Sequence, residues 1–227
     1  SVDYLADSLQ KHCSSFCSAN DVIIFRAFEH LRKANSIGSK DNDVKLQELS
    51  IAVKLLKNVG GSLTIDNLKE AVSIMIKLDY YPEVIEFVLD IANIIDKDKL
   101  AIKYLNDGQP INDERRKVYN MKIERFKLIF DILVEIDIKS IQSYENFRKN
   151  YGNDPINLES TKLRDQSYAL CFKYNDKLFH YEFYDWFVAQ NFDKKLLEID
   201  TPFILSYLKE RPVHSAEIFS WLSHRKT

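Results

Sequence analysis

The placement of the helix-breaking residues constrains the fold of this chain more than any other feature of its sequence. The 227 residues include only five glycines and five prolines, below the ~7% and ~5% of average usage. All of them stand between stretches in which apolar residues recur with the period of a helix, and none stands inside such a stretch. Because both residue types weaken a helix interior, this placement predicts an all-α chain that is broken at or near these residues. They are Gly38, Gly60, Gly61, Gly108, Gly152, Pro82, Pro110, Pro155, Pro202 and Pro212.

The apolar spacing divides the chain into about a dozen helices. In one of them Leu68 and Val72 share a face, and Thr64 stands at the N-cap position before it. A long helix is predicted from about residue 112 to 135, followed by a weaker, separate helix over about 139–149. No segment alternates apolar and polar residues with the period of a strand, so the sequence predicts no strand.

These helices are predicted to stack as an irregular α-solenoid of antiparallel helix pairs, with residues 1–227 as a single segment. The junctions are short, so consecutive helices are expected to lie side by side in opposite directions. The segment 178–188 is apolar or aromatic nearly all round, which is typical of a helix that is covered on two sides. A compact bundle is the alternative, because no fixed sequence repeat is present.

Six residues are expected to act as structural anchors of the stack. Pro82 and Pro202 each suit the first turn of a helix, and Thr201 is expected to cap the helix that Pro202 begins. The other anchors are aromatic residues of the segment 178–188, namely Phe179, Phe183, Trp186 and Phe187. A last apolar stripe is expected to cover the end of the stack and consists of Ile218, Phe219, Trp221 and Leu222.

The charged residues are nearly balanced, which argues against a surface built for nucleic acid or anionic lipid. The chain has 32 Lys and Arg against 34 Asp and Glu, a formal net charge of −2. In the long helix Lys122, Arg125 and Lys127 stand around Glu124, and we expect these charges on the surface. No apolar stretch approaches the ~20 residues that a membrane-spanning helix needs.

The cysteines indicate the redox compartment of the chain, and its first residue indicates that it is part of a longer protein. Cys13, Cys17 and Cys171 form no disulfide framework, and no second cysteine pair is present to complete a metal site. The sequence has neither a signal-peptide pattern nor a glycosylation sequon, so a reducing compartment is expected. The chain begins at Ser1 rather than Met, and we expect it to be a piece of a longer protein.

Motifs that would indicate catalysis are absent from the sequence. There is no glycine-rich nucleotide loop, no HExxH zinc motif and no GxSxG nucleophile elbow. The segment 96–98 begins like a calcium loop, but Leu100 and Ala101 stand where that loop needs an acid or Asn and a glycine. The sequence therefore predicts no catalytic, cofactor-binding or metal site, no cofactor and no small-molecule substrate.

One enzymatic alternative stays open on the residues alone. His180 and Asp185 stand close together in the sequence, and Cys171 is the thiol nearest to them. We favour a structural interpretation in which His180 lies among aromatic rings with one hydrogen-bond partner. In this interpretation Cys171 is a small buried apolar residue.

Four short motifs follow one another in the last third of the chain. They are Leu178-Phe179-His180, Tyr184-Asp185-Trp186, Leu196-Leu197-Glu198 and Thr201-Pro202-Phe203. With the segments 21–31, 78–92 and 106–110, they resemble the C-terminal region of the large non-repetitive/WGA-negative nucleoporins, the propeller-plus-solenoid scaffold proteins of the nuclear pore inner ring. Ile204-Leu205 replaces a Leu-Glu pair of that family, and the stretch 140–165 resembles nothing that we can place.

The resemblance implies a solenoid segment of a structural, non-enzymatic protein of the nuclear pore complex at the nuclear envelope, with a role in protein and mRNA transport. It implies contacts with other scaffold nucleoporins and with linear segments of linker nucleoporins, and no direct membrane contact by this piece. A groove between helix pairs is expected to hold such a segment, although the sequence does not identify its residues. The composition, rich in Asn, Lys and Ile, indicates a fungal member. A generic helical adaptor outside the pore is the alternative.

Overall fold

The structure is a computed structural model and describes residues 2–12, 18–191, 196, 198 and 200–211. In that part of the chain it contains helices and no strand, so the all-α prediction is confirmed. The elements are α1 (Val2–His12), α2 (Ala19–Ile37), α3 (Asn42–Asn58), η1 (Gly60–Ser62), α4 (Ile65–Lys77), α5 (Tyr81–Ile95), α6 (Leu100–Asn106), α7 (Arg115–Tyr151), α8 (Glu159–Lys173), α9 (Lys177–Ala189) and α11 (Ile204–Glu210). Several residues named above lie outside the described part: Cys13, Cys17, Leu197, Pro212, Ile218, Phe219, Trp221 and Leu222.

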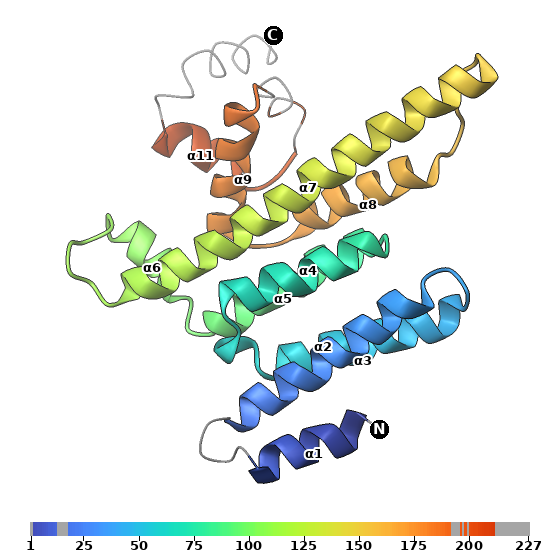
Figure 1. The fold of residues 1–227 in the computed structure, drawn as a ribbon. Coiled ribbons are helices and arrows are strands. Elements are labelled where there is room, and N and C mark those ends of the chain that lie inside the picture. The colour runs from blue at the N-terminus through green and yellow to red at the C-terminus, as the bar shows by residue number, and fades with distance from the viewer. Residues whose placement is uncertain (1, 13–17, 192–195, 197, 199, 212–227) are drawn as a thin grey trace.

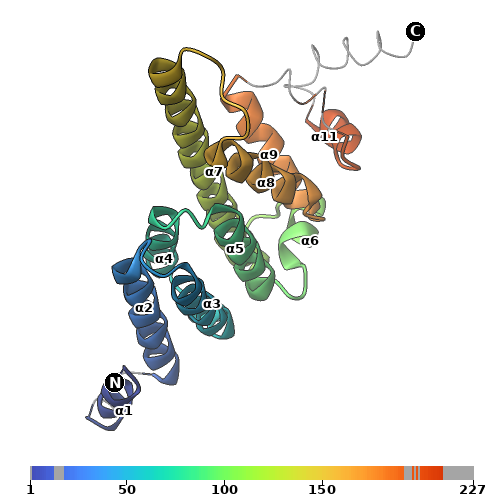
Figure 2. The ribbon, with the colours of Figure 1, turned by 90° about the vertical axis from the view of Figure 1, so that its right-hand side faces the viewer.

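The helices follow one another along a stack, with α1 at one end of the described part and α11 toward the other (Figures 1 and 2). The hairpin of α2 and α3 comes after α1, then α4 and α5, and then the long hairpin of α7 and α8. In the last hairpin Tyr168 of α8 contacts Asp137 of α7, and Thr161 contacts Ser140, so the two helices run antiparallel. This arrangement is the predicted irregular α-solenoid of antiparallel helix pairs.

Local sequence signals set where the helices begin and end. Thr64 caps α4 as predicted, since its hydroxyl accepts a hydrogen bond from the Asn67 backbone N–H at 3.1 Å. Pro82 stands in the first turn of α5, also as predicted. The C-terminus of α7 lies at Gly152. Its φ of 73° is the left-handed conformation that glycine adopts without a side-chain clash.

The expected division of the long helix is wrong, because α7 is one helix from Arg115 to Tyr151. Neither glycine nor proline occurs within it, so no backbone feature ends it near residue 137. In its second half α8 supplies the packing: the Tyr168 hydroxyl donates to the Asp137 carboxylate at 2.7 Å. Ile138 and Ile141 are exposed there, which is why the apolar period of the sequence weakens along this stretch.

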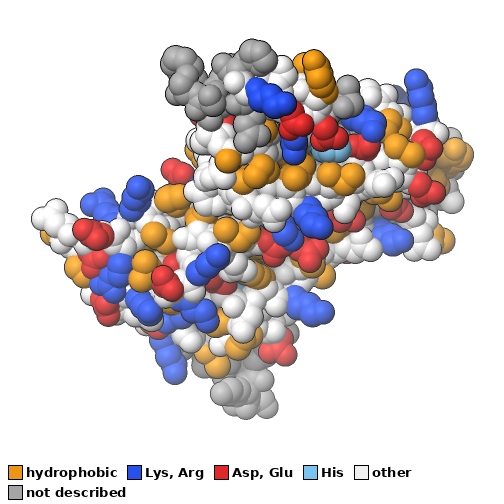
Figure 3. All heavy atoms as spheres, turned by 90° about the horizontal axis from the view of Figure 1, so that it is seen from below, with side chains coloured by type: hydrophobic (Ala, Val, Ile, Leu, Met, Phe, Trp, Pro, Cys, Tyr) orange, Lys and Arg blue, Asp and Glu red, His pale blue; other side chains and the backbone are white. Residues whose placement is uncertain are grey.

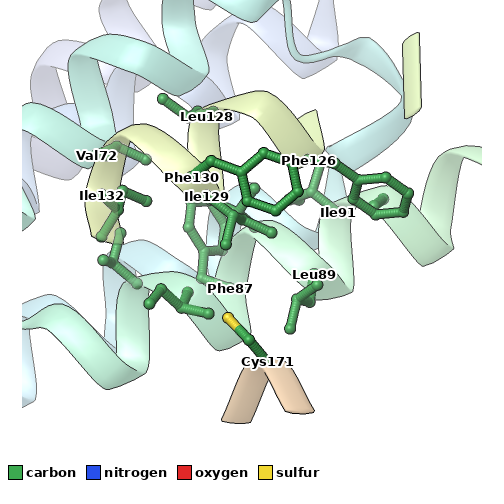
Figure 4. Packing of buried hydrophobic residues seen from close by; sticks show 14 of the residues in the cluster. Val72, Phe87, Leu89, Ile91, Phe126, Leu128, Ile129, Phe130, Ile132 and Cys171 are labelled. Atoms are coloured by element: carbon green, nitrogen blue, oxygen red, sulfur yellow. The ribbon is translucent and has the colours of Figure 1, made fainter. Parts of the chain in front are cut away.

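The main core lies where α5 packs against α7 and α8. Figure 4 shows Phe87 and Leu89 of α5 facing Ile129 and Phe130 of α7, with the thiol of Cys171 pointing toward them from α8. Cys171 is completely buried, as expected for a small apolar residue, and burial raises the pKa of its thiol. Burying apolar surface of this kind stabilises a fold by about 25 cal/mol for each Å².

The prediction that Lys122 lies on the surface is also wrong, since only 3% of this residue is exposed. Its ammonium group lies 3.2 Å from the Asp96 carboxylate and 2.8 Å from the Asp176 carboxylate. Asp96 accepts a hydrogen bond from the Leu100 backbone N–H at 2.6 Å, and Asp176 accepts one from the Phe179 backbone N–H at 2.8 Å. Lys122 of α7 thus joins the carboxylates that hold the first turns of α6 and α9.

Arg125 lies one turn further along α7 on the same side of the helix as Lys122. It is also buried, so the prediction that it lies on the surface is wrong as well. Its guanidinium donates to the backbone carbonyl of Leu63 at 3.2 Å, and to that of Met121 at 3.0 Å. Burial lowers the pKa of Arg125. Glu124 and Lys127 are exposed as predicted, so the charged cluster divides between the two faces of one helix.

We expect Lys122→Ala to lower the free energy of unfolding by about 3–5 kcal/mol, because it leaves two carboxylates without their shared cation. Urea denaturation of the purified chain measures this loss. Lys127→Ala, which removes an exposed amine from the same helix, is the matched control and should change stability by less than about 0.5 kcal/mol. Equal stability of the two variants would show that the buried ion pairs do not hold these helices together.

Candidate interaction surface

Helix α9 forms the aromatic centre of the C-terminal half of the described chain. Phe179, Phe183 and Phe187 are buried in it. The Phe179 ring meets Phe126 of α7 edge-on at 5.1 Å between centroids, and the Phe183 ring lies on Phe130 at 5.7 Å. These predicted anchor positions therefore lie in the core, and Phe187 also borders a groove described below.

Trp186 differs from the other aromatic residues of α9, because it is only partly buried. Its ring stacks on Phe130 at 5.6 Å and on Phe183 at 6.0 Å. The opposite side of α9 faces α11, where Tyr207 lies edge-on to Tyr184 at 5.2 Å between ring centroids. α9 is thus covered on two sides, as its all-round apolar sequence predicts.

The predicted cap at Thr201 is wrong. The Thr201 hydroxyl forms a hydrogen bond with the Tyr184 hydroxyl of α9, and α11 begins at Ile204 without a side-chain cap. Pro202 is exposed and lies before this helix rather than in its first turn. The hydroxyl that could have capped α11 instead ties this turn to α9.

His180 is buried, with 1% of the residue exposed, and both ring nitrogens have partners. Nε2 lies 2.6 Å from the Tyr174 carbonyl oxygen, and Nδ1 lies 3.1 Å from the Tyr184 hydroxyl. Since a carbonyl only accepts, Nε2 carries the proton and Nδ1 accepts from the hydroxyl. This tautomer is the neutral imidazole, and burial lowers the pKa of His180.

The residues of the enzymatic alternative are not brought together. The Asp185 carboxylate accepts from the Tyr207 hydroxyl at 2.7 Å and pairs with Arg211. Within the described part of the chain, no hydrogen bond or ion pair links His180 to Asp185 or to Cys171. Each polar group of the alternative is occupied in packing between helices, which is the structural interpretation favoured by the sequence.

Two grooves open along α8. The first, which we call the aromatic groove, has a volume of about 620 Å³ and lies where α8 meets α9 and the segment 198–201. Its lining residues are Asp137, Arg164, Asp165, Tyr168, Ala169, Phe172, Phe187, Glu198, Asp200 and Thr201. Aromatic rings form its floor and acidic side chains its edge, a combination suited to binding part of another protein.

The second groove, which we call the hairpin groove, has a volume of about 790 Å³ and lies between the C-terminal half of α7 and the N-terminal half of α8. Arg164 borders both grooves, so the two are contiguous. The lining residues are Ser140, Ile141, Tyr144, Glu145, Arg148, Lys149, Pro155, Asn157, Leu158, Thr161 and Arg164.

The sequence did not identify either groove, and most of the hairpin groove falls in the stretch 140–165 that resembled nothing familiar. A usable signal was present, since Ile141 and Tyr144 interrupt a polar stretch at helical spacing. In the structure 55% of Ile141 and 37% of Tyr144 are exposed. Both side chains line the hairpin groove, so this stretch of α7 gives the groove an apolar part.

Charges of both signs cover the face of the molecule that is seen from below (Figure 3). Lys and Arg side chains alternate with Asp and Glu over the face seen in Figure 3, in keeping with the net charge of −2. Among the described residues, no three His, Cys, Asp or Glu side chains are arranged to hold a metal ion. Among the described helices, none has both the length and the apolar character that crossing a membrane requires.

We expect Phe183→Ala to lower the free energy of unfolding by about 3–5 kcal/mol, because it empties a completely buried ring site. Trp186→Ala should cost less, although Trp is the larger side chain, because part of its ring already faces water. Chemical denaturation of both variants measures the difference. A greater loss for Trp186→Ala would contradict the packing of α9 described above.

The buried neutral His180 should make stability depend on pH. The unfolded chain binds a proton at the ordinary pKa of 6.5, whereas the folded chain binds it only at lower pH. Stability is therefore full above pH 6.5 and falls as the pH drops below that value, by at most ~1.4 kcal/mol per pH unit. Unfolding curves at several pH values should show a flatter profile for His180→Gln. Parallel profiles for the two proteins would exclude this role for His180.

Comparisons with known proteins identify the family. The family model described as non-repetitive/WGA-negative nucleoporin C-terminal matches residues 1–224. Nucleoporin NUP170 of Saccharomyces cerevisiae is 45% identical over 221 residues, a match that covers 96% of this chain and 14% of the yeast protein. Nucleoporin NUP170 of Chaetomium thermophilum is 32% identical over 208 residues, or 92% of this chain and 14% of that protein. This chain thus spans about one seventh of the length of these relatives.

Solved structures agree with this match. The crystal structure of Chaetomium thermophilum Nup170 SOL aligns with 100% of this chain and 28% of its own, with a TM-score of 0.84 and 27% sequence identity. The crystal structure of the Chaetomium thermophilum Nup170 CTD–Nup145N complex aligns with 84% of this chain and 34% of its own, with a TM-score of 0.64 and 28% identity. The chain therefore belongs to the non-repetitive/WGA-negative nucleoporin C-terminal family, whose members are components of the nuclear pore complex at the nuclear envelope.

Proposed function

We propose that this chain is a structural segment of the nuclear pore scaffold, which acts through protein–protein contacts in nucleocytoplasmic transport and has no enzymatic activity. The observation that carries the proposal is a helical solenoid of the Nup170 type with two open grooves along α8. Helices α2 to α9 and α11 share one cluster of buried residues, which supports treating residues 1–227 as one unit. Solenoids of this kind present extended surfaces to partners.

The partners that we propose are other nucleoporins, including linear segments of linker nucleoporins. The solved Nup170 CTD of Chaetomium thermophilum is in complex with Nup145N, and this supports a nucleoporin partner for the present chain. The contiguous grooves along α8 also support a linear segment as the ligand, because an extended or helical peptide fits a groove between helices. Nucleic acid, membrane and small-molecule substrates are not part of this proposal.

The absence of catalysis is part of the proposal rather than a measurement. It is supported by the occupied hydrogen bonds of His180 and by the pairing of Asp185 with Tyr207. A generic helical adaptor outside the pore is the second candidate function. It shares the fold, and a tagged full-length protein that stays away from the nuclear envelope would favour it.

We expect the purified chain to bind Nup145N in isothermal titration calorimetry, with a dissociation constant in the micromolar range or tighter, which is ~8 kcal/mol of binding free energy or more. The full-length protein carrying a fluorescent tag should form a rim at the nuclear envelope. Phe183→Ala, which disturbs the core, serves as the control for binding that depends on the fold. If neither Nup145N nor any other nucleoporin segment binds, the chain acts only as a spacer and the proposed partners are wrong.

A further inference from the structure

We propose that the aromatic groove binds a linear protein segment in which an aromatic or aliphatic side chain stands next to Lys or Arg. This inference rests on the proposed function and names the chemistry of the ligand and the groove that holds it. It comes from two properties of the groove, an apolar floor formed by α8 and α9 and an acidic edge formed by α7, α8 and the segment 198–200.

The floor of the aromatic groove consists of rings and one small side chain. Phe187 of α9 is buried beneath it, and Tyr168 and Phe172 of α8 are partly exposed beside it. The Tyr168 ring lies 6.3 Å from Phe172 and 6.4 Å from Phe187, so the rings form one continuous surface. Ala169 is exposed among them and leaves room for a ligand side chain. Such a floor would bury an aromatic or aliphatic side chain and shield it from water.

The edge of the groove has four carboxylates and a single cation. The guanidinium of Arg164 is engaged with its neighbour Asp165 at 2.9 Å and 3.1 Å. Glu198 and Asp200 are exposed, and in the described part of the chain neither forms a hydrogen bond or an ion pair. Asp137 accepts from the Tyr168 hydroxyl. The edge is therefore strongly acidic although the chain as a whole is nearly neutral, and it complements Lys or Arg.

The hairpin groove lies next to the aromatic groove and is lined by charges of both signs. Asp137, Ile141, Tyr144 and Arg148 follow at helical spacing on one face of α7, over about 16 Å at 1.5 Å per residue. Arg148 and Lys149 border the far end of this groove. Arg148 pairs there with Asp154 at 3.4 Å, and Glu145 also lines this groove. A segment that continues along α7 from the aromatic groove therefore meets the apolar side chains of Ile141 and Tyr144.

Two short synthetic peptides test this inference. One has Phe and Leu at its centre with Lys or Arg on both sides, and the other has Glu in place of each Lys or Arg. Fluorescence anisotropy with the wild-type chain should show binding of the basic peptide, and affinity for the acidic peptide should be about tenfold weaker or more. Binding of the basic peptide should also weaken as salt is raised.

Variants of the chain locate the binding. Glu198→Lys/Asp200→Lys should weaken the basic peptide by about tenfold or more. The matched control is Asp131→Lys/Glu135→Lys, which makes the same charge change on exposed residues of α7 outside both grooves and should leave binding unchanged. Ala169→Gln fills the floor without changing the charge and should also weaken binding. Thermal melting of each variant shows whether the fold is kept. If Glu198→Lys/Asp200→Lys, the charge-reversal variant, unfolds, Ala169→Gln still tests the groove, because its site is exposed on a helix.

Several results would overturn this inference. Equal affinity for the two peptides, or an unchanged affinity in Glu198→Lys/Asp200→Lys and in Ala169→Gln, would exclude the aromatic groove as their site. Self-association in analytical ultracentrifugation that the reversal variant abolishes would assign the groove to a second copy of the chain instead. If Nup145N binds wild type and these variants equally, the proposed function stands and only the groove assignment fails. If the peptides discriminate as expected but no nucleoporin segment binds, the assigned chemistry stands and the proposed partners are wrong.

Discussion

The buried ammonium group of Lys122 is the interaction on which the arrangement of the C-terminal helices depends. It neutralises Asp96 and Asp176 at 3.2 Å and 2.8 Å, and each of these carboxylates also holds the first turn of a helix. Taking three charges out of water is unfavourable unless they satisfy one another. The three charges are therefore paired only when α6, α7 and α9 are packed together. This network is a strong constraint on how the helices of the solenoid are arranged.

Helix α7, which carries Lys122, contacts most of the helices in the second half of the described chain. Its first half is covered by α5, α6 and α9, and beyond Lys139, which still contacts Asp79 and Tyr81, it forms a hairpin with α8. Because fewer helices cover this hairpin, apolar side chains such as Ile141 and Tyr144 remain on its surface and the grooves form along α8. The part of α7 that extends beyond these covering helices has a weaker apolar pattern in its sequence. The same part forms the surface to which we assign binding.

Two polar residues of α9, His180 and Asp185, take part in packing between elements of the C-terminal half. His180 joins the Tyr174 carbonyl to the Tyr184 hydroxyl, and Asp185 joins Tyr207 to Arg211. These contacts connect α9 with the turn before it and with α11. A nucleoporin scaffold segment requires such rigidity, because its grooves keep their shape only if the helices that border them do not move apart.

The sequence by itself determined the helical class, the described junctions that glycine or proline marks, and local signals such as Thr64 and Pro82, because these depend on backbone propensities within a few residues. It also placed Phe183 in the core, since an apolar pattern on all sides of a helix leaves no exposed face. Only the tertiary structure decided that Lys122 is buried, that the Thr201 hydroxyl binds α9, and that Glu198 shares a groove with Phe172. Those outcomes depend on residues distant in the sequence, whose charges and shapes become partners only when the helices are stacked.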